Sequence, residues 1–124
     1  MTVFFRLTGI ILILAIWLGS LMPLNNVVLP GSDKLHHFAA YGGLMLIWVL
    51  ATPHLNLRRQ ALMACVFMLM GLTIEVAQGF TPYRFFEWAD ALANAVGVLI
   101  GWTFGQLALR IQTALSLKRT VTAL

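Results

Sequence analysis

Hydrophobic residues along this chain form four long runs that are separated by short polar segments. The runs cover approximately residues 4–22, 35–52, 60–79 and 88–109. A helix needs about 20 apolar residues to cross the hydrocarbon core of a bilayer, and each run reaches or nearly reaches that length. The pattern therefore predicts an all-α protein: a bundle of four transmembrane helices that forms a single domain over residues 1–124.

The composition favours the same interpretation. Hydrophobic residues make up 60% of the 124 residues and charged residues only 10%, whereas a soluble domain carries about 25% charged residues. The apolar surface must therefore face lipid or a partner. The single cysteine, Cys65, can form no disulfide within the chain. The first run lacks a small-residue cleavage site after it, so we interpret it as a retained helix and not as a signal peptide.

Basic residues lie mostly on one side of this predicted topology. With the N-terminus inside, the inner side holds Arg6, Arg58, Arg59, Arg110, Lys118 and Arg119, and the outer side holds Lys34 and Arg84. Because Lys and Arg concentrate in cytoplasmic segments, both termini are predicted to be cytoplasmic. Residues 110–124 form a basic cytoplasmic tail that either continues the last helix or is a frayed end. No basic cluster is interleaved with polar residues, so we expect no nucleic-acid binding.

Polar side chains gather at the predicted outer end, and the inner half has almost nothing comparable. The outer set comprises Asp33, Lys34, His36, His37, Tyr41, Glu75, Gln78, Arg84, Glu87, Asp90 and Asn94. Within it, Asp33, His37 and Tyr41 are spaced by four residues and share one helix face. Ionisable groups at membrane depth cost several kcal/mol unless they are paired or hydrated, so this convergence favours a functional site over pure architecture.

Glu75 and Asp90 need partners at this depth. The candidates are Lys34, His37, Tyr41 and Arg84. We expect a carboxylate paired with Arg84, because a guanidinium group can bind two carboxylate oxygens at once.

Glycines form a stripe on the last predicted helix. Asp90, Asn94, Gly97, Gly101 and Gly105 follow one another at helical spacing. Glycine removes the side chain from a helix face and lets a neighbouring helix approach closely, so we expect this stripe to be a helix-packing surface. The candidate contact points on the neighbouring helices are Gly42, Gly43 and Gly71. Such a stripe suits dimerisation as well as packing within the chain, so a homo-oligomer remains open.

Four segments together resemble the signature of the VanZ-like family. They are Asp33-Lys34-Leu35-His36-His37-Phe38-Ala39-Ala40-Tyr41, Glu75-x-x-Gln78, Pro82-x-Arg84 and Asp90-x-x-x-Asn94-x-x-Gly97. In order and spacing they match the family's D-K-x-x-H-F-x-x-Y, E-x-x-Q, P-x-R and D-x-x-x-N-x-x-G patterns. The resemblance implies a small multi-pass protein of the bacterial cytoplasmic (inner) membrane, in a family whose namesake is associated with resistance to the glycopeptide teicoplanin.

The resemblance also implies a set of ligand-binding residues. They are Asp33, Lys34, His37, Tyr41, Glu75, Gln78, Arg84, Asp90 and Asn94. In one hypothesis, Lys34 and Arg84 hold a phosphate or carboxylate of a membrane lipid or a lipid-linked peptidoglycan precursor at the outer leaflet. The aromatic loop at residues 80–88 would then cover the lipid tail or sugar.

Two other functions stay open. In a membrane-embedded hydrolase or transferase, His37 would act as a general base that Asp90 or Glu75 orients, with water as the nucleophile. Alternatively, the chain is a purely structural accessory subunit. Whether it is an enzyme is therefore undecided at this point.

We expect no cofactor and no resident metal. Usable zinc ligands are present among His36, His37, Asp33, Glu75 and Asp90. However, the chain has no H-E-x-x-H motif, and two adjacent histidines on one helix point in different directions.

Overall fold

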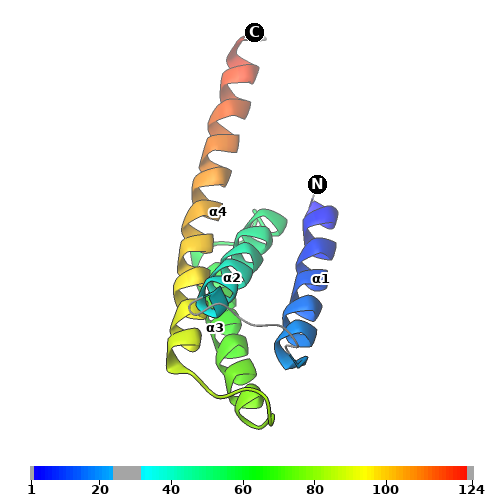
Figure 1. The fold of residues 1–124 in the computed structure, drawn as a ribbon. Coiled ribbons are helices and arrows are strands. Elements are labelled where there is room, and N and C mark those ends of the chain that lie inside the picture. The colour runs from blue at the N-terminus through cyan, green and yellow to red at the C-terminus, as the bar shows by residue number, and fades with distance from the viewer. Residues whose placement is uncertain (1, 24–31, 123–124) are drawn as a thin grey trace.

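The structure is a computed structural model that describes residues 2–23 and 32–122, and these residues form four α-helices and no strand. The helices are α1 (Thr2–Leu21), α2 (Ser32–Ala51), α3 (Leu57–Gly79) and α4 (Trp88–Thr122). Successive helices run in opposite directions, so the two ends of the chain point to the same end of the bundle (Figure 1). We call this the inner end, following the predicted orientation, and the opposite end the outer end. The predicted all-α class with four helices is confirmed.

Three of the helices, α1, α3 and α4, are long and apolar enough to cross a membrane. The fourth, α2, has 20 residues but is less apolar, because Asp33, Lys34 and two histidines occupy its first two turns. Its second half is nevertheless fully buried at Leu44, Met45 and Val49. This helix lies between α1 and α4 (Figure 1) and supplies much of the core, and apart from its Leu35 the large exposed apolar side chains belong to the rest of the described chain.

The closest helix contact joins α2 to α4 and depends on glycine. A Cβ added at Gly97 would collide with the carbonyl oxygen of Phe38, and one added at Gly101 would collide with the carbonyl oxygen of Gly42. Both obstacles are backbone atoms, which cannot rotate away as a side chain can. The glycine stripe of α4 therefore packs against α2 of the same chain.

The remaining glycines of the predicted contact set differ from one another. A Cβ at Gly105 would lie 2.8 Å from the side chain of Val49, and one at Gly71 would lie 3.0 Å from Asn94. Nothing lies within 4 Å of a Cβ built at Gly43. Of the two adjacent glycines on α2, only Gly42 therefore serves the close approach of α4.

The inner end holds buried polar side chains of its own. Gln60 is only 2% exposed, and its Oε1 accepts hydrogen bonds from Trp102 Nε1, at 3.0 Å, and from the amide of Gln106. Its Nε2 donates to the carbonyl oxygen of Leu55 at 3.2 Å. The expectation that this half has almost nothing comparable to the outer end was wrong. Neutral glutamines here satisfy one another across α3 and α4 and need no charged partner.

The last helix is longer than its apolar run. The sequence pattern ends it near residue 109, but α4 continues to Thr122 and extends beyond the other three helices (Figure 1). Its side chains are exposed from Arg110 onward. Of the two interpretations of the tail, the continued helix is the one seen.

Candidate functional site

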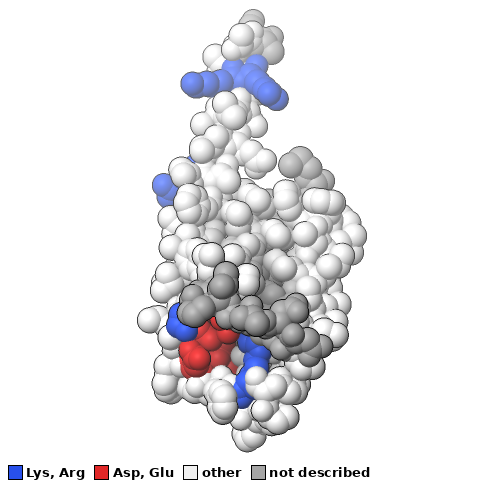
Figure 2. Space-filling view, viewed as in Figure 1, with Lys and Arg blue, Asp and Glu red and all other residues white. Residues whose placement is uncertain are grey.

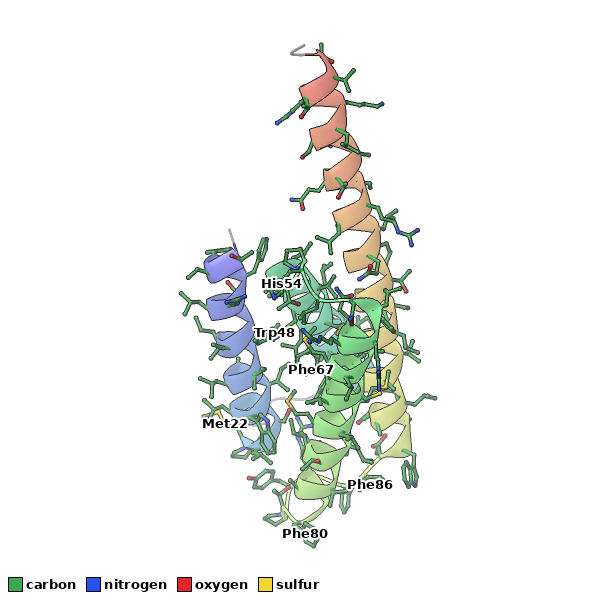
Figure 3. The ribbon with its side chains drawn as sticks, turned by 180° about the vertical axis from the view of Figure 1, so that it is seen from behind. Met22, Trp48, His54, Phe67, Phe80 and Phe86 are labelled. Carbon is green, nitrogen blue, oxygen red and sulfur yellow. The ribbon has the colours of Figure 1, made fainter. Side chains whose placement is uncertain are left out.

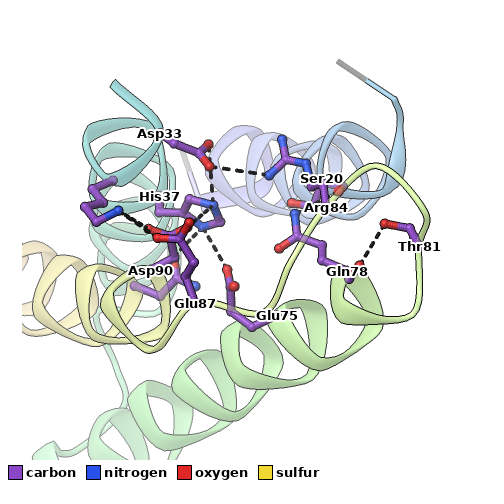
Figure 4. Close-up of polar contacts among 11 residues, drawn as sticks. Ser20, Asp33, His37, Glu75, Gln78, Thr81, Arg84, Glu87 and Asp90 are labelled. Atoms are coloured by element: carbon purple, nitrogen blue, oxygen red, sulfur yellow. Dashed lines mark hydrogen bonds and ion pairs between the residues drawn. The ribbon is translucent and has the colours of Figure 1, made fainter. Parts of the chain in front are cut away.

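Side chains from α2, α3 and α4 converge on the imidazole of His37 at the outer end (Figure 4). This side chain is buried, and its Nδ1 lies 3.0 Å from Asn94 Oδ1 and 3.5 Å from Glu75 Oε1. An amide oxygen can only accept a hydrogen bond, so Nδ1 carries a proton and donates it to Asn94. This contact fixes the orientation of the ring between α3 and α4.

The other ring nitrogen of His37 faces two carboxylates. Nε2 lies 3.8 Å from Asp33 Oδ1 and 3.9 Å from Asp90 Oδ2. Asp33 is one helical turn before His37 on α2, and Asp90 lies in the first turn of α4. Both distances are longer than a hydrogen bond, so Nε2 and the two carboxylate oxygens face one another without a hydrogen bond between them.

Each of these two aspartates turns its second oxygen toward a basic side chain. Arg84 Nη1 lies 3.6 Å from Asp33 Oδ2, and Lys34 Nζ lies 3.4 Å from Asp90 Oδ1. Lys34 also donates a hydrogen bond of 3.0 Å to Glu87, which raises the pKa of Lys34 above its ordinary value. The arginine therefore pairs with Asp33 and not with the deeper carboxylates. Both basic side chains already face carboxylates, which makes this site less suited to the anion binding that was one hypothesis.

Several buried polar atoms have no hydrogen-bond partner among the described residues. Glu75 is fully buried, and neither of its carboxylate oxygens accepts a hydrogen bond. The Tyr41 hydroxyl, Asn94 Nδ2 and Arg84 Nε are also without a partner. A buried polar group left without one costs about 1–3 kcal/mol. Complete hydrogen bonding of the cluster therefore needs polar groups beyond the side chains that the structure describes.

Gln78 belongs to a different contact. Its Nε2 donates to the carbonyl oxygen of Ser20 at 2.8 Å, and the Tyr83 hydroxyl donates to that of Leu21 at 2.9 Å. These carbonyls lie in the last turn of α1, where no further turn of helix supplies donors. Figure 4 shows Gln78 beside Ser20, away from His37. Its visible role is to hold the end of α1 against α3.

The structure thus brings most of the predicted ligand-binding residues together. Those within the cluster are Asp33, Lys34, His37, Glu75, Arg84, Asp90 and Asn94, with Tyr41 buried one turn below His37. His36 is exposed and takes no part in these contacts. Glu87 joins the cluster through Lys34, although only the outer polar set and not the predicted ligand-binding set included it. Its position three residues before Asp90 was the signal that could have identified it.

The charge of the cluster is unbalanced. Four carboxylates face two basic side chains, which leaves two negative charges in excess when all four carboxylates are ionised and His37 is neutral. In Figure 2 the acidic patch lies near the outer end with basic side chains on either side, and other basic side chains gather near the far tip of α4. The cluster therefore favours a ligand that carries positive charge or hydrogen-bond donors.

Aromatic side chains surround the outer tip of α3. Phe80 and Phe86 lie at this tip (Figure 3), and the ring of Phe86 packs edge-on against that of Trp88 at 4.8 Å. Phe80, Phe85 and Trp88 are largely exposed. Exposed aromatic rings at the end of apolar helices are typical of the headgroup level of a bilayer.

Together these features define a small all-helical membrane protein with a buried charged cluster at one end of its bundle. The chain belongs to the VanZ/LLP1 family, which it matches over residues 3–109. The resemblance carried by the four sequence segments is confirmed. No curated protein and no solved structure matches the chain.

Proposed function

We propose that this chain is a multi-pass protein of the bacterial cytoplasmic membrane that binds an envelope lipid or a lipid-linked peptidoglycan precursor at the outer leaflet. In this proposal the binding contributes to resistance to teicoplanin-type glycopeptides. The observation that carries it is the set of buried polar atoms that have no hydrogen-bond partner within residues 2–23 and 32–122, above all both carboxylate oxygens of Glu75. Such atoms are costly unless another molecule satisfies them.

The charges of the cluster favour a particular headgroup chemistry. The excess of carboxylates around His37 favours hydrogen-bond donors such as the hydroxyl, amide or amino groups of a sugar or stem peptide. Arg84 has one guanidinium nitrogen without a partner among the described residues, and this nitrogen can donate to an acceptor on the same ligand. The exposed rings of Phe80, Phe85 and Trp88 would contact the acyl chain or the sugar face.

Teicoplanin susceptibility tests this proposal in cells. The wild-type chain and a Glu75→Gln variant would be expressed in a susceptible bacterium at equal membrane levels. We expect the wild type to raise the inhibitory concentration and the variant to lose that rise, because glutamine replaces an acceptor with a donor at nearly the same volume. His54→Ala is the control, since His54 is exposed at the inner turn. Full resistance in the Glu75→Gln strain would overturn the proposal.

A binding measurement then separates recognition from indirect effects. The purified protein in lipid nanodiscs would be titrated with a fluorescent lipid-linked precursor and, separately, with bulk phospholipid of the same chain length. We expect saturable binding of one of these ligands that Glu75→Gln weakens at least tenfold and His54→Ala leaves unchanged. Equal binding by all three proteins would reject the site.

The second candidate function is a hydrolase or transferase. The surroundings of His37 favour it: Glu75 lies 3.5 Å from one ring nitrogen and Asp90 lies 3.9 Å from the other, as in a base with its orienting acid. Water would be the nucleophile. Incubation of the purified protein with the lipid-linked precursor, followed by mass spectrometry of the products, tests for turnover. An unchanged precursor after prolonged incubation counts against this function and leaves the binding proposal intact.

A further inference from the structure

We propose that Asp33, His37 and Asp90 form a binding site for a divalent metal ion of the zinc class. One ligand atom from each residue lies within 4.8 Å of the other two (Figure 4). The inference goes beyond lipid recognition and does not depend on it. Sequence analysis disfavoured a metal because two adjacent histidines diverge, but this site uses only one of them.

The first argument for a metal site is the hydrogen bonding of the His37 imidazole. Because Nδ1 of His37 keeps its proton and donates a hydrogen bond to Asn94, the free lone pair of the neutral ring is on Nε2. That lone pair faces the oxygens of Asp33 and Asp90 at 3.8 and 3.9 Å. Three atoms that can accept but not donate a hydrogen bond, one nitrogen and two carboxylate oxygens, thus face one another. Zinc lies about 2.0–2.2 Å from an imidazole nitrogen or a carboxylate oxygen that binds it. Two ligand atoms that are 3.8 or 3.9 Å apart can therefore bind the same ion between them.

The second argument is that each proposed ligand side chain has a further polar contact that orients it. Asn94 holds the far nitrogen of His37, Arg84 faces the other oxygen of Asp33, and Lys34 faces the other oxygen of Asp90. Metal sites in proteins commonly orient their ligands through such outer contacts. Lys34 and Arg84 therefore act as positioning residues that leave one oxygen of each aspartate for the ion.

A third observation comes from outside the ligand set. Glu75 is fully buried on the Nδ1 side of the same ring, and its oxygens accept no hydrogen bond from the described residues. With Glu75 ionised, the four carboxylates of the cluster exceed its basic side chains by two charges. A divalent ion would neutralise this excess and lower the cost of burying Glu75. The donors are one nitrogen and carboxylate oxygens, which suits zinc or manganese and not a thiolate-seeking metal.

Metal binding to the tag-free protein tests the inference directly. The wild type, purified in detergent without chelator and stripped with EDTA, would be titrated with zinc chloride by calorimetry. We expect one zinc per chain, at least tenfold weaker binding by Asp90→Asn, and unchanged binding by His36→Ala. His36 is the matched control because it is the adjacent histidine and is exposed. No binding by the wild type, or an equal loss in His36→Ala, would overturn the site.

A second variant keeps the inference testable if Asp90→Asn fails to fold. Lys34→Met retains all three ligands and removes only the group that orients Asp90. Loss of such an outer contact typically weakens metal binding by about 10–100-fold, and we expect a decrease of that size. We also expect zinc to raise the melting temperature of the wild type more than that of Lys34→Met. Equal zinc affinity and equal stabilisation in both proteins would contradict the assigned role.

Discussion

Asn94 joins two features of this molecule through one side chain. Its Oδ1 accepts a hydrogen bond of 3.0 Å from His37 Nδ1, and its side chain fills the space above Gly71. We predict that Asn94→Ala lowers the free energy of unfolding by about 1–3 kcal/mol, because the buried ring N–H loses its 3.0 Å hydrogen bond and the nearest remaining acceptor, Glu75 Oε1, lies at 3.5 Å. Thermal unfolding in detergent, followed by circular dichroism, measures the loss.

The control for this substitution lies on the same helix. Thr103 is exposed on α4, and its hydroxyl donates only to the carbonyl oxygen of Leu99 in its own helix. Thr103→Ala should change the free energy of unfolding by less than about 0.5 kcal/mol. If Asn94→Ala unfolds at the same temperature as Thr103→Ala, its hydrogen bond to His37 contributes nothing to stability.

Residue spacing predicted part of this site and could not predict the rest. Helical periodicity placed Asp33, His37 and Tyr41 on one face, and in the structure His37 lies between Asp33 and Asp90 while Tyr41 is buried one turn below. Gln78 was grouped with them but contacts a backbone carbonyl of α1. Every residue offers such a carbonyl, so no pattern of residue types could reveal this partner. The same holds for Gln60, whose Oε1 accepts from Trp102 and Gln106, both more than 40 positions away in the sequence.

At the level of helices, the α2–α4 contact gives a sharp prediction. Gly101→Ala would drive a methyl group into the backbone of Gly42, and we expect a loss of about 1–3 kcal/mol. Gly43→Ala is the matched control, because a Cβ there meets nothing within 4 Å. Alanine is a better helix former than glycine, so the control should be neutral or slightly stabilising. Melting temperatures in detergent compare the two, and similar values would contradict the close packing.

The position of α1 gives a second prediction at this scale. Gln78 and Tyr83 hold the last carbonyls of α1, at Ser20 and Leu21. We expect the double variant Gln78→Ala with Tyr83→Phe to loosen this turn, because two of its orphan carbonyls lose their donors. Amide hydrogen exchange should become faster at the end of α1 and stay unchanged in the middle of α4. Uniform acceleration along the whole chain would instead indicate a global loss of stability.

The boundaries of α3 and α4 differ from the boundaries of the apolar runs that predicted them. The run in the third segment begins at Gln60, but α3 begins at Leu57 because the side chain of Asn56 accepts from the backbone N–H of Arg59 at 3.0 Å. At the same end of the bundle, α4 continues past its apolar run through residues that are exposed. Hydropathy predicts the part of a helix that suits lipid, whereas hydrogen bonding and caps decide where the helix ends.

On the scale of the whole molecule, charge is distributed unequally between the two ends of the bundle. Both termini and the start of α3 lie at the inner end, which therefore carries most of the basic residues (Figure 1). The inner basic residues are Arg6, Arg58, Arg59, Arg110, Lys118 and Arg119. The outer end carries Lys34 and Arg84, which carboxylates partly neutralise. A cytoplasmic position for the inner end is what this asymmetry favours.

Cysteine labelling tests that orientation. In a Cys65→Ser background, single cysteines would be introduced as Phe85→Cys in the exposed outer loop and Ser116→Cys in the exposed part of α4. We predict that a membrane-impermeant maleimide labels Phe85→Cys in intact spheroplasts and labels Ser116→Cys only after permeabilisation. The reverse result would place the His37 cluster at the cytoplasmic face. Recognition of an outer-leaflet ligand would then be untenable, whereas zinc binding by the purified protein would be unaffected, because it depends on the local ligands alone.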